Sequence, residues 1–219
     1  MQAPDGFGAS DSSRQPATQL RVRKRVWTDV AKVVSTVCNP FLASLALFVI
    51  LAGARSRSSH EFWVLLFNSA FFTSIAPMLF IFYLYATDRI SDLDMSIRSE
   101  RERVFLAFVV LYALGGLDLW LIHAPTIMTA TMAGYAASLL IVQWITRYWK
   151  ISTHALGVTA PLVVLTVLFG DEPVPFYVLI LLVGWSRVYL RAHTLLQVVA
   201  GVGLALGTTL LFFRIFRVV

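Results

Sequence analysis

The chain has 219 residues, of which 58% are hydrophobic and only 14% are charged, with a formal net charge of +6. Ordinary soluble domains carry about 25% charged residues, so this composition excludes a disordered chain and argues strongly against a soluble globular domain. The single cysteine, Cys38, excludes an intramolecular disulfide and a cysteine-based zinc site. Because a chain this apolar needs a bilayer as its solvent, the positive charge indicates membrane topology and anionic headgroups rather than nucleic acid.

Along the chain, residues 1–25 are polar and rich in Ser, Gly and Pro, which predicts a disordered tail. Residues 26–219 are predicted to form one transmembrane domain. Its apolar runs are unbroken rather than alternating, so we expect helices rather than a β-barrel. The runs are 31–54, 62–86, 104–122, 126–147, 153–170, 174–190 and 193–213. The predicted fold is an all-α bundle of six or seven transmembrane spans.

Polar residues within and between these runs predict a helix kink and the membrane face on which the turns lie. Asn39-Pro40 lies inside the first run and predicts a kink. The hydrophilic stretch 87–103 contains five of the twelve acidic residues and four arginines. With seven spans, this stretch and the turns at 147–154 and 186–193 fall on one membrane face, because two helices separate each from the next. Charged and imidazole side chains are therefore predicted to converge at that face.

The turn at 186–193 contains a histidine with candidate partners. His193 and Gln197 are four residues apart, so on a helix they share a face, and the amide oxygen can accept the Nδ1 proton and leave Nε2 free. Arg187, six residues before His193, can hold an oxyanion with its planar fork of donors. The turn at 147–154 adds a cation, a hydroxyl and a second imidazole that suit phosphate binding and general acid catalysis: Lys150, Ser152 and His154.

These residues resemble the motifs of the type 2 phosphatidic acid phosphatase family, the membrane relatives of the vanadium haloperoxidases. The third motif of that family is Ser-Arg, five residues, His, three residues and Asp. Ser186-Arg187 with His193 and Gln197 matches every spacing, with Gln in the Asp position.

The other two motifs are matched in part. The second is Pro-Ser-Gly-His, and residues 151–154 retain its Ser and His, with Ile and Thr in place of Pro and Gly. The first is Lys, six residues, Arg-Pro. Arg101 has the spacing of that arginine, whereas Asp94 stands in the Lys position and Glu102 in the Pro position. The resemblance spans roughly residues 88–213.

The resemblance implies a haloperoxidase-like helical core and a phosphomonoester hydrolase that needs no metal and no cofactor. His193 would attack phosphorus and form a phosphohistidine, while His154 would protonate the leaving oxygen and then activate water. Gln197 would orient His193. The phosphate oxygens would be bound by residues at motif positions, namely Arg187, Arg101 and Ser152, and the missing lysine could be replaced by Lys150 or Arg98.

The predicted function is an integral-membrane lipid phosphatase acting on an isoprenoid phosphate or pyrophosphate, or on phosphatidic acid, with membrane lipids as its partners. Two other functions stay open. A magnesium-dependent prenyl or lipid transferase is favoured by the spacing of Asp88, Asp92 and Asp94, although no second acidic cluster completes such a site. A non-catalytic membrane scaffold or lipid binder of the same fold is favoured by Asp94 and Gln197, which depart from the family motifs.

Basic residues divide unequally between the two predicted faces. The face of the N-terminal tail has 14 of the 18 Lys and Arg residues, and the opposite face has the other four. The positive-inside rule then predicts that the N-terminus and the motif face are cytoplasmic, in the inner cell membrane. Without the motif-bearing turns the division is six against four, so this prediction depends on the basic residues between positions 21 and 32.

Overall fold

The computed structural model of the chain describes residues 15–92 and 97–219, with the side chains of these residues except 15–23 and 98. Every regular element in these ranges is a helix, which confirms the predicted all-α class. In chain order the elements are α1 (Gln15–Val37), α2 (Pro40–Arg55), α3 (Ser59–Ala70), the π-helical η1 (Phe71–Ile75), α4 (Ala76–Ala86), α5 (Arg98–Leu121), α6 (Thr126–Thr146), α7 (Thr153–Phe169), the 3-10 helix η2 (Val174–Tyr177), α8 (Val178–Tyr189) and α9 (Leu195–Ile215).

Several of these helices are long and apolar enough to cross a bilayer. Among the described residues the candidates are Ser59–Ala86, Ser99–Leu121, Thr126–Thr146 and Leu195–Ile215, with the bent pair α1–α2 as a fifth. Two other apolar helices, α7 and α8, are shorter. The 17 residues of α7 reach only about 25 Å at 1.5 Å each, less than a hydrocarbon core of about 30 Å. The protein therefore has four or five candidate spans, and the predicted count of six or seven is not confirmed.

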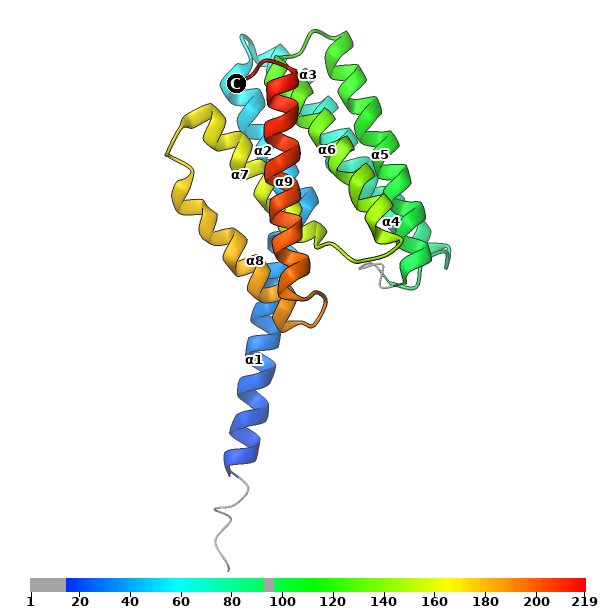
Figure 1. Cartoon of the computed structure of the whole chain (residues 1–219), viewed down its shortest axis with the longest axis vertical. Coiled ribbons are helices and arrows are strands. Elements are labelled where there is room, and N and C mark those ends of the chain that lie inside the picture. The colour runs from blue at the N-terminus through cyan, green and yellow to red at the C-terminus, as the bar shows by residue number, and fades with distance from the viewer. Residues whose placement is uncertain (1–14, 93–96) are drawn as a thin grey trace, which may run out of the picture.

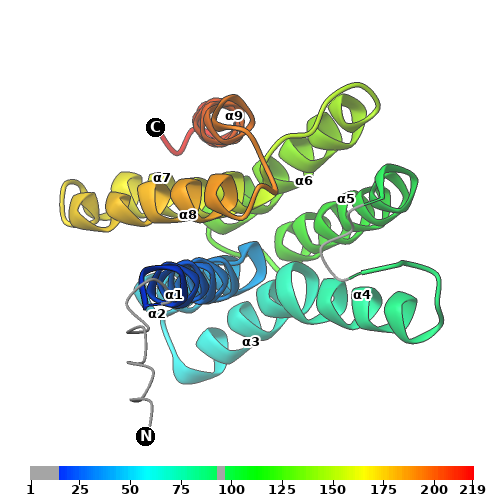
Figure 2. The same ribbon diagram turned by 90° about the horizontal axis from the view of Figure 1, so that it is seen from below.

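The helices form one bundle in which the chain alternates in direction (Figure 1). The connections α4–α5, α6–α7 and α8–α9 all lie at the end of the bundle from which α1 projects (Figure 1). Seen along the bundle, α1 and α2 lie between the α7–α8 pair and α3 (Figure 2). The three polar turns that the sequence analysis assigned to one face therefore lie at the same end of the molecule.

The kink predicted at Asn39-Pro40 is a complete break between α1 and α2, with a bend of 44°. Asn39 is extended, at φ −77° and ψ 156°, and its side-chain oxygen accepts a hydrogen bond from the Leu42 N–H at 2.9 Å. Pro40 is the first residue of α2, where a missing N–H is tolerated. The break places the N-terminus of α2 inside the bundle rather than at its end.

Two glycines allow α7 to approach its neighbours closely. A Cβ atom on Gly201 of α9 would lie 2.5 Å from the carbonyl oxygen of Ser152, and a Cβ atom on Gly157 of α7 would collide with Pro40 of α2. Only a residue without a side chain fits at these two positions. The N-terminal turn of α7 is thereby held between α2 and α9.

Helix α1 begins at Gln15, so residues 15–25 of the predicted tail are helical, whereas residues 1–14 lie outside the described residues. Further along, α1 packs against α8, where the rings of Trp27 and Trp185 meet edge to face at 6.0 Å between centroids. This packing brings the last turns of α1 beside the C-terminal end of α8.

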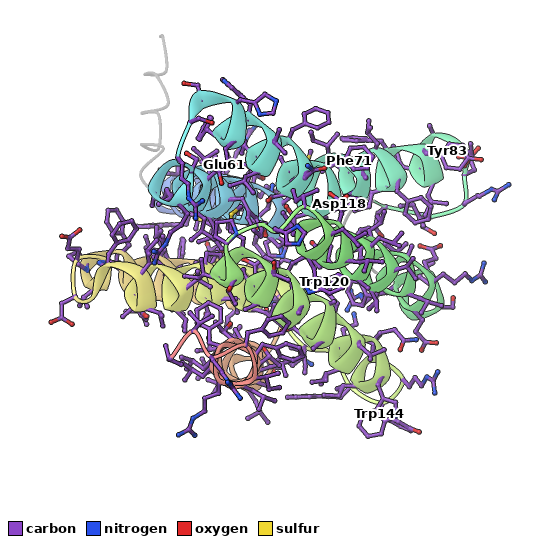
Figure 3. All side chains as sticks on the ribbon, turned by 90° about the horizontal axis from the view of Figure 1, so that it is seen from above. Glu61, Phe71, Tyr83, Asp118, Trp120 and Trp144 are labelled. Carbon is purple, nitrogen blue, oxygen red and sulfur yellow. The ribbon has the colours of Figure 1, made fainter. Side chains whose placement is uncertain are left out.

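Large apolar side chains cover much of the outside of the bundle. Tyr83 and Trp144 lie at its periphery when it is seen from above (Figure 3), and both are more than half exposed, as is Trp120. Exposed aromatic side chains at this density suit a surface in contact with lipid. The surface therefore agrees with the apolar composition in indicating a membrane protein.

Candidate active site

A cavity of about 440 Å³ brings together four of the predicted site residues: Arg101, His154, Arg187 and His193. They come from four elements, because Arg101 lies in the first turn of α5, His154 in that of α7, Arg187 in the last turn of α8, and His193 in the loop before α9. The cavity is also lined by residues of α1, α2, α4 and α6. The predicted convergence of the three polar turns is thus present in the structure.

His193 is buried in the short loop between α8 and α9. The N–H groups of Ala192 and His193 both donate to the carbonyl oxygen of Arg187, at 3.0 and 3.2 Å. Arg191 adopts the left-handed conformation, at φ 56°, which is common where a helix ends. This tight reversal returns the His193 imidazole toward the end of α8.

The partner of His193 is the side chain of Gln197, which belongs to a capping box at the start of α9. Its Oε1 atom accepts a hydrogen bond from the Thr194 N–H at 3.1 Å and lies 3.1 Å from Nδ1 of His193. A backbone N–H can only donate, so the atom that it meets must be the amide oxygen. Nδ1 of His193 is therefore the donor in the second bond, and Nε2 carries the free lone pair.

The N-termini of α7 and α9 are tied together next to the second histidine. The Ser152 N–H donates to the carbonyl oxygen of Gln197 at 3.1 Å, and the Ser152 hydroxyl accepts from the Ala155 N–H at 3.4 Å as the N-cap of α7. His154 follows this cap by two residues and lines the cavity. The loop that orients His193 and the turn that carries His154 are thus joined through the backbone.

Arg187 is buried and is held by a serine far away in the sequence. Its Nη1 atom donates to Oγ of Ser35 at 2.7 Å, across 152 residues. Ser35 and Lys32 both lie on α1 and line the cavity, and the side chain of Lys32 is also exposed to the outside. The sequence analysis assigned neither residue to the site. Their spacing of three residues on one helical face, just before the Asn39-Pro40 break, is the signal that could have identified them.

Positive charge dominates the polar end of the cavity. The guanidinium groups of Arg101 and Arg187 are buried there, and Lys32 adds a third cation. The N-terminal turns of α2 and α7 also line the cavity, and helix N-termini favour anions. This end of the cavity is suited to bind a multiply charged anion such as a phosphate.

The same environment acts on His193, which lies in a loop outside the membrane-spanning helices. Burial first, and the charge of Arg187 second, lower the pKa of His193 to about 4. The hydrogen bond to Gln197 opposes this shift, whereas Arg101 and Lys150 add to it. Above pH 4 the imidazole is therefore neutral, with Nε2 able to act as a nucleophile or base.

The remaining predicted site residues are placed differently. Ser152 is fully buried and its hydroxyl caps α7, and neither Ser152 nor Lys150 is among the residues that line the cavity. Arg98 is the first residue of α5, and its side chain is not among those described. Their roles as phosphate ligands stay predictions.

The residues of the alternative magnesium site are only partly described. Asp94, which the transferase hypothesis requires, lies outside the described residues. Within residues 15–92 and 97–219, no group of three or more His, Cys, Asp or Glu side chains is placed to hold a metal ion.

Comparisons with known proteins bear on the part of the chain that carries most of the site. Neither the curated proteins nor the solved structures give a match. Residues 128–218 match the family model described as the PAP2 superfamily. The matched segment contains His154, Arg187 and His193, whereas Arg101 and the residues of α1 lie outside it. The resemblance inferred from the motif spacing is therefore confirmed over residues 128–218, which match the PAP2 superfamily.

Proposed function

We propose that this protein is an integral-membrane phosphatase that removes the phosphate group of a lipid phosphate, such as an isoprenoid phosphate or pyrophosphate or phosphatidic acid, through a phosphohistidine intermediate. The observation that carries this proposal is the cavity in which two imidazoles and two guanidiniums meet next to an apolar lining. The match to the PAP2 superfamily supports the same class of chemistry.

In the first step, Nε2 of His193 attacks phosphorus while the bond between phosphorus and the lipid oxygen breaks. The free lone pair on Nε2 and the neutral state of the ring prepare His193 for this role. His154, on the facing turn, gives a proton to the leaving oxygen. Burial, and then the charges of Arg187 and His193, lower the pKa of His154 to about 3, so a bound phosphate dianion must offset these effects for the ring to carry the proton that it supplies.

In the second step, water attacks the phosphohistidine and His154 takes a proton from it. The phosphorus–nitrogen bond breaks, inorganic phosphate leaves, and His193 returns to its neutral state. Gln197 keeps the ring of His193 in one tautomer through both steps.

Arg187 and Arg101 are proposed to bind the phosphate oxygens and to stabilise the charge of the pentacoordinate transition state. Ser35 holds Arg187 in place through the 2.7 Å hydrogen bond. Lys32 lines the same cavity and is proposed to make the phosphate contact of the lysine in the first family motif, because Asp94 occupies that motif position here.

The experiment that tests the proposed function is phosphate release from a panel of lipid phosphates by the purified protein in EDTA. We expect turnover that EDTA leaves unchanged, and inhibition by vanadate, which can take the trigonal bipyramidal geometry of the transition state. Turnover that requires added magnesium would instead favour the transferase hypothesis. A well-folded protein that releases phosphate from none of these lipids would favour a non-catalytic membrane scaffold or lipid binder.

Replacing Gln197 by Asp is expected to move the acid limb of the pH–rate profile to higher pH. In the wild-type protein, activity should fall as His193 becomes protonated near pH 4. A carboxylate beside Nδ1 stabilises the imidazolium and raises this pKa by about one unit or more, so activity is lost at a higher pH. The measurement is kcat/KM as a function of pH. Gln197→Glu, which keeps the side-chain length, should shift the limb in the same direction. Unchanged profiles in both variants would contradict a hydrogen bond between residues 193 and 197 in solution.

The division of basic residues leads us to place the site at the cytoplasmic face of the inner cell membrane. The predicted topology assigns fourteen of the 18 Lys and Arg residues to the side of the N-terminal tail and the motif-bearing turns. The phosphate of the substrate must then lie in the cytoplasmic leaflet, on the same side as His193.

A further inference from the structure

The apolar part of the cavity is a slot that follows one face of α5. Arg101, Phe105, Phe108 and Tyr112 all line the cavity. They are spaced four, three and four residues apart, which places them on one side of the helix. At 1.5 Å per residue, the slot extends about 16 Å from Arg101 at its charged end to Tyr112 at its far end.

Tyrosine rings form a fixed wall at the far end of the slot. Tyr112 and Tyr135 both line the cavity and are each only 6% exposed. The Tyr112 hydroxyl donates to the Thr73 carbonyl oxygen at 3.2 Å, and the two tyrosine rings lie 6.0 Å apart. The Tyr135 ring also meets Phe48 edge to face at 6.3 Å. These contacts hold both rings in place, so a chain that reaches them meets a rigid barrier.

The volume of the cavity limits what it can hold. A cavity of about 440 Å³ lies toward the small end of the range for ligand pockets, which is about 300–1,000 Å³. A phosphate group about 5 Å across at the charged end leaves about 11 Å of the roughly 16 Å slot, which is the length of an extended chain of about nine or ten carbons. One hydrocarbon chain of this length fits lengthwise in the slot, and a cavity of this size is small for the glycerol and two acyl chains of phosphatidic acid.

We propose that the cavity binds a lipid monophosphate by a single hydrocarbon chain, and that Tyr112 and Tyr135 set the longest chain that it accommodates. This inference rests on the proposed function for the position of the phosphate, at the end formed by Arg101, Arg187 and the two histidines. Linear alkyl and branched prenyl phosphates both combine a phosphomonoester with a single chain, whereas a diacyl lipid phosphate carries two chains.

The test uses the full-length protein in detergent and monophosphates of linear alkyl chains of increasing length. Prenyl monophosphates form a second series, and phosphatidic acid is the two-chain comparison. We expect kcat/KM to rise about fourfold for each added methylene, because burying one methylene is worth about 0.8 kcal/mol. The rise should stop at about ten carbons, where a chain that extends along the roughly 16 Å slot meets the tyrosine wall. Phosphatidic acid should be a poorer substrate than the best single-chain lipid. The comparison of the two series shows whether branching is tolerated.

Variants of the end wall provide the decisive comparison. Tyr135→Ala should shift the cut-off to longer chains. The matched control is Tyr83→Ala, which removes an exposed tyrosine from the outer surface and should not move the cut-off. Leu139 also lines the cavity, so Leu139→Phe should narrow the slot and shift the cut-off to shorter chains even if Tyr135→Ala does not fold.

A second measurement separates this inference from the proposed function. Thermal stabilisation of the protein by the same lipids reports binding whether or not they are hydrolysed. Stabilisation that rises with chain length to the same cut-off, without phosphate release, would refute the phosphatase and retain the single-chain slot. Turnover and stabilisation that do not depend on chain length, or that are stronger with phosphatidic acid, would overturn the slot and leave the phosphatase intact.

Discussion

Replacing His193 by alanine is expected to reduce phosphate release by a factor of at least about 10³, because the variant lacks the nucleophile that forms the phosphohistidine. The ring is small and lies in a loop, so the fold should survive its removal. The measurement is phosphate release from the best lipid phosphate of the panel, together with the thermal unfolding temperature of the variant. His60→Ala is the matched control, because His60 is an exposed histidine on α3 that does not line the cavity.

Chemical rescue distinguishes a nucleophile from a structural residue at this position. In a His193→Gly variant, added imidazole should enter the vacated space and restore part of the turnover, and it should have no such effect on the His60→Ala protein. A His193→Ala protein that keeps turnover near the wild-type level would remove His193 from the mechanism. A folded, inactive His193→Gly protein that imidazole does not rescue would instead indicate a structural role for His193.

Replacing His154 by alanine is expected to lower the turnover of an alkyl phosphate by a factor of about 10² to 10⁴, which is the usual contribution of a general acid or base. An alkoxide is a poor leaving group and needs a proton in the transition state. A nitrophenolate leaves without one, so p-nitrophenyl phosphate should phosphorylate His193 of the variant at close to the wild-type rate. The second step still lacks its base, and the phosphohistidine should accumulate.

The measurement that follows is a rapid-mixing experiment with p-nitrophenyl phosphate. We expect the His154→Ala protein to release one equivalent of nitrophenolate in a burst and then to turn over slowly. If His154 only supports the structure, alkyl and nitrophenyl phosphates should lose activity equally, with no burst. Equal effects on the two substrates, with no burst, would also be expected if another group supplied the proton. Such a result would exclude His154 as the general acid.

The sequence was sufficient for those features that depend on composition or on neighbouring residues. Helices were predictable because a backbone in lipid must satisfy its own hydrogen bonds, and unbroken apolar runs leave few alternatives. The break between α1 and α2 was predictable because proline cannot donate within a helix. The partnership of His193 and Gln197 was also predictable, although it forms in a capping box before α9 rather than on a helical face.

The number of membrane spans could not be predicted from the apolar runs alone. The sequence analysis counted the runs 153–170 and 174–190 as spans from their apolar character. In the structure they form α7 and the short pair η2–α8, which are not among the candidate membrane spans. The two apolar runs are themselves only 18 and 17 residues long, and the residues that bound the first, Ser152 before α7 and Gly170 after it, end that helix at 17 residues. Helices of this length fall short of the roughly 20 residues that a span needs.

The sequence by itself therefore determined the membrane class, the helical architecture, the resemblance of residues 128–218 to the PAP2 superfamily and the pair His193–Gln197, because each of these follows from composition or from residues within a few turns of one another. Only the tertiary structure decided that Lys32 and Ser35 of α1 reach the cavity, that the Ser152 hydroxyl is engaged as a cap, and that aromatic rings close the far end of the slot. The physical reason is that packing between distant helices depends on shape at each contact, such as Gly201 against Ser152, and no local pattern encodes it.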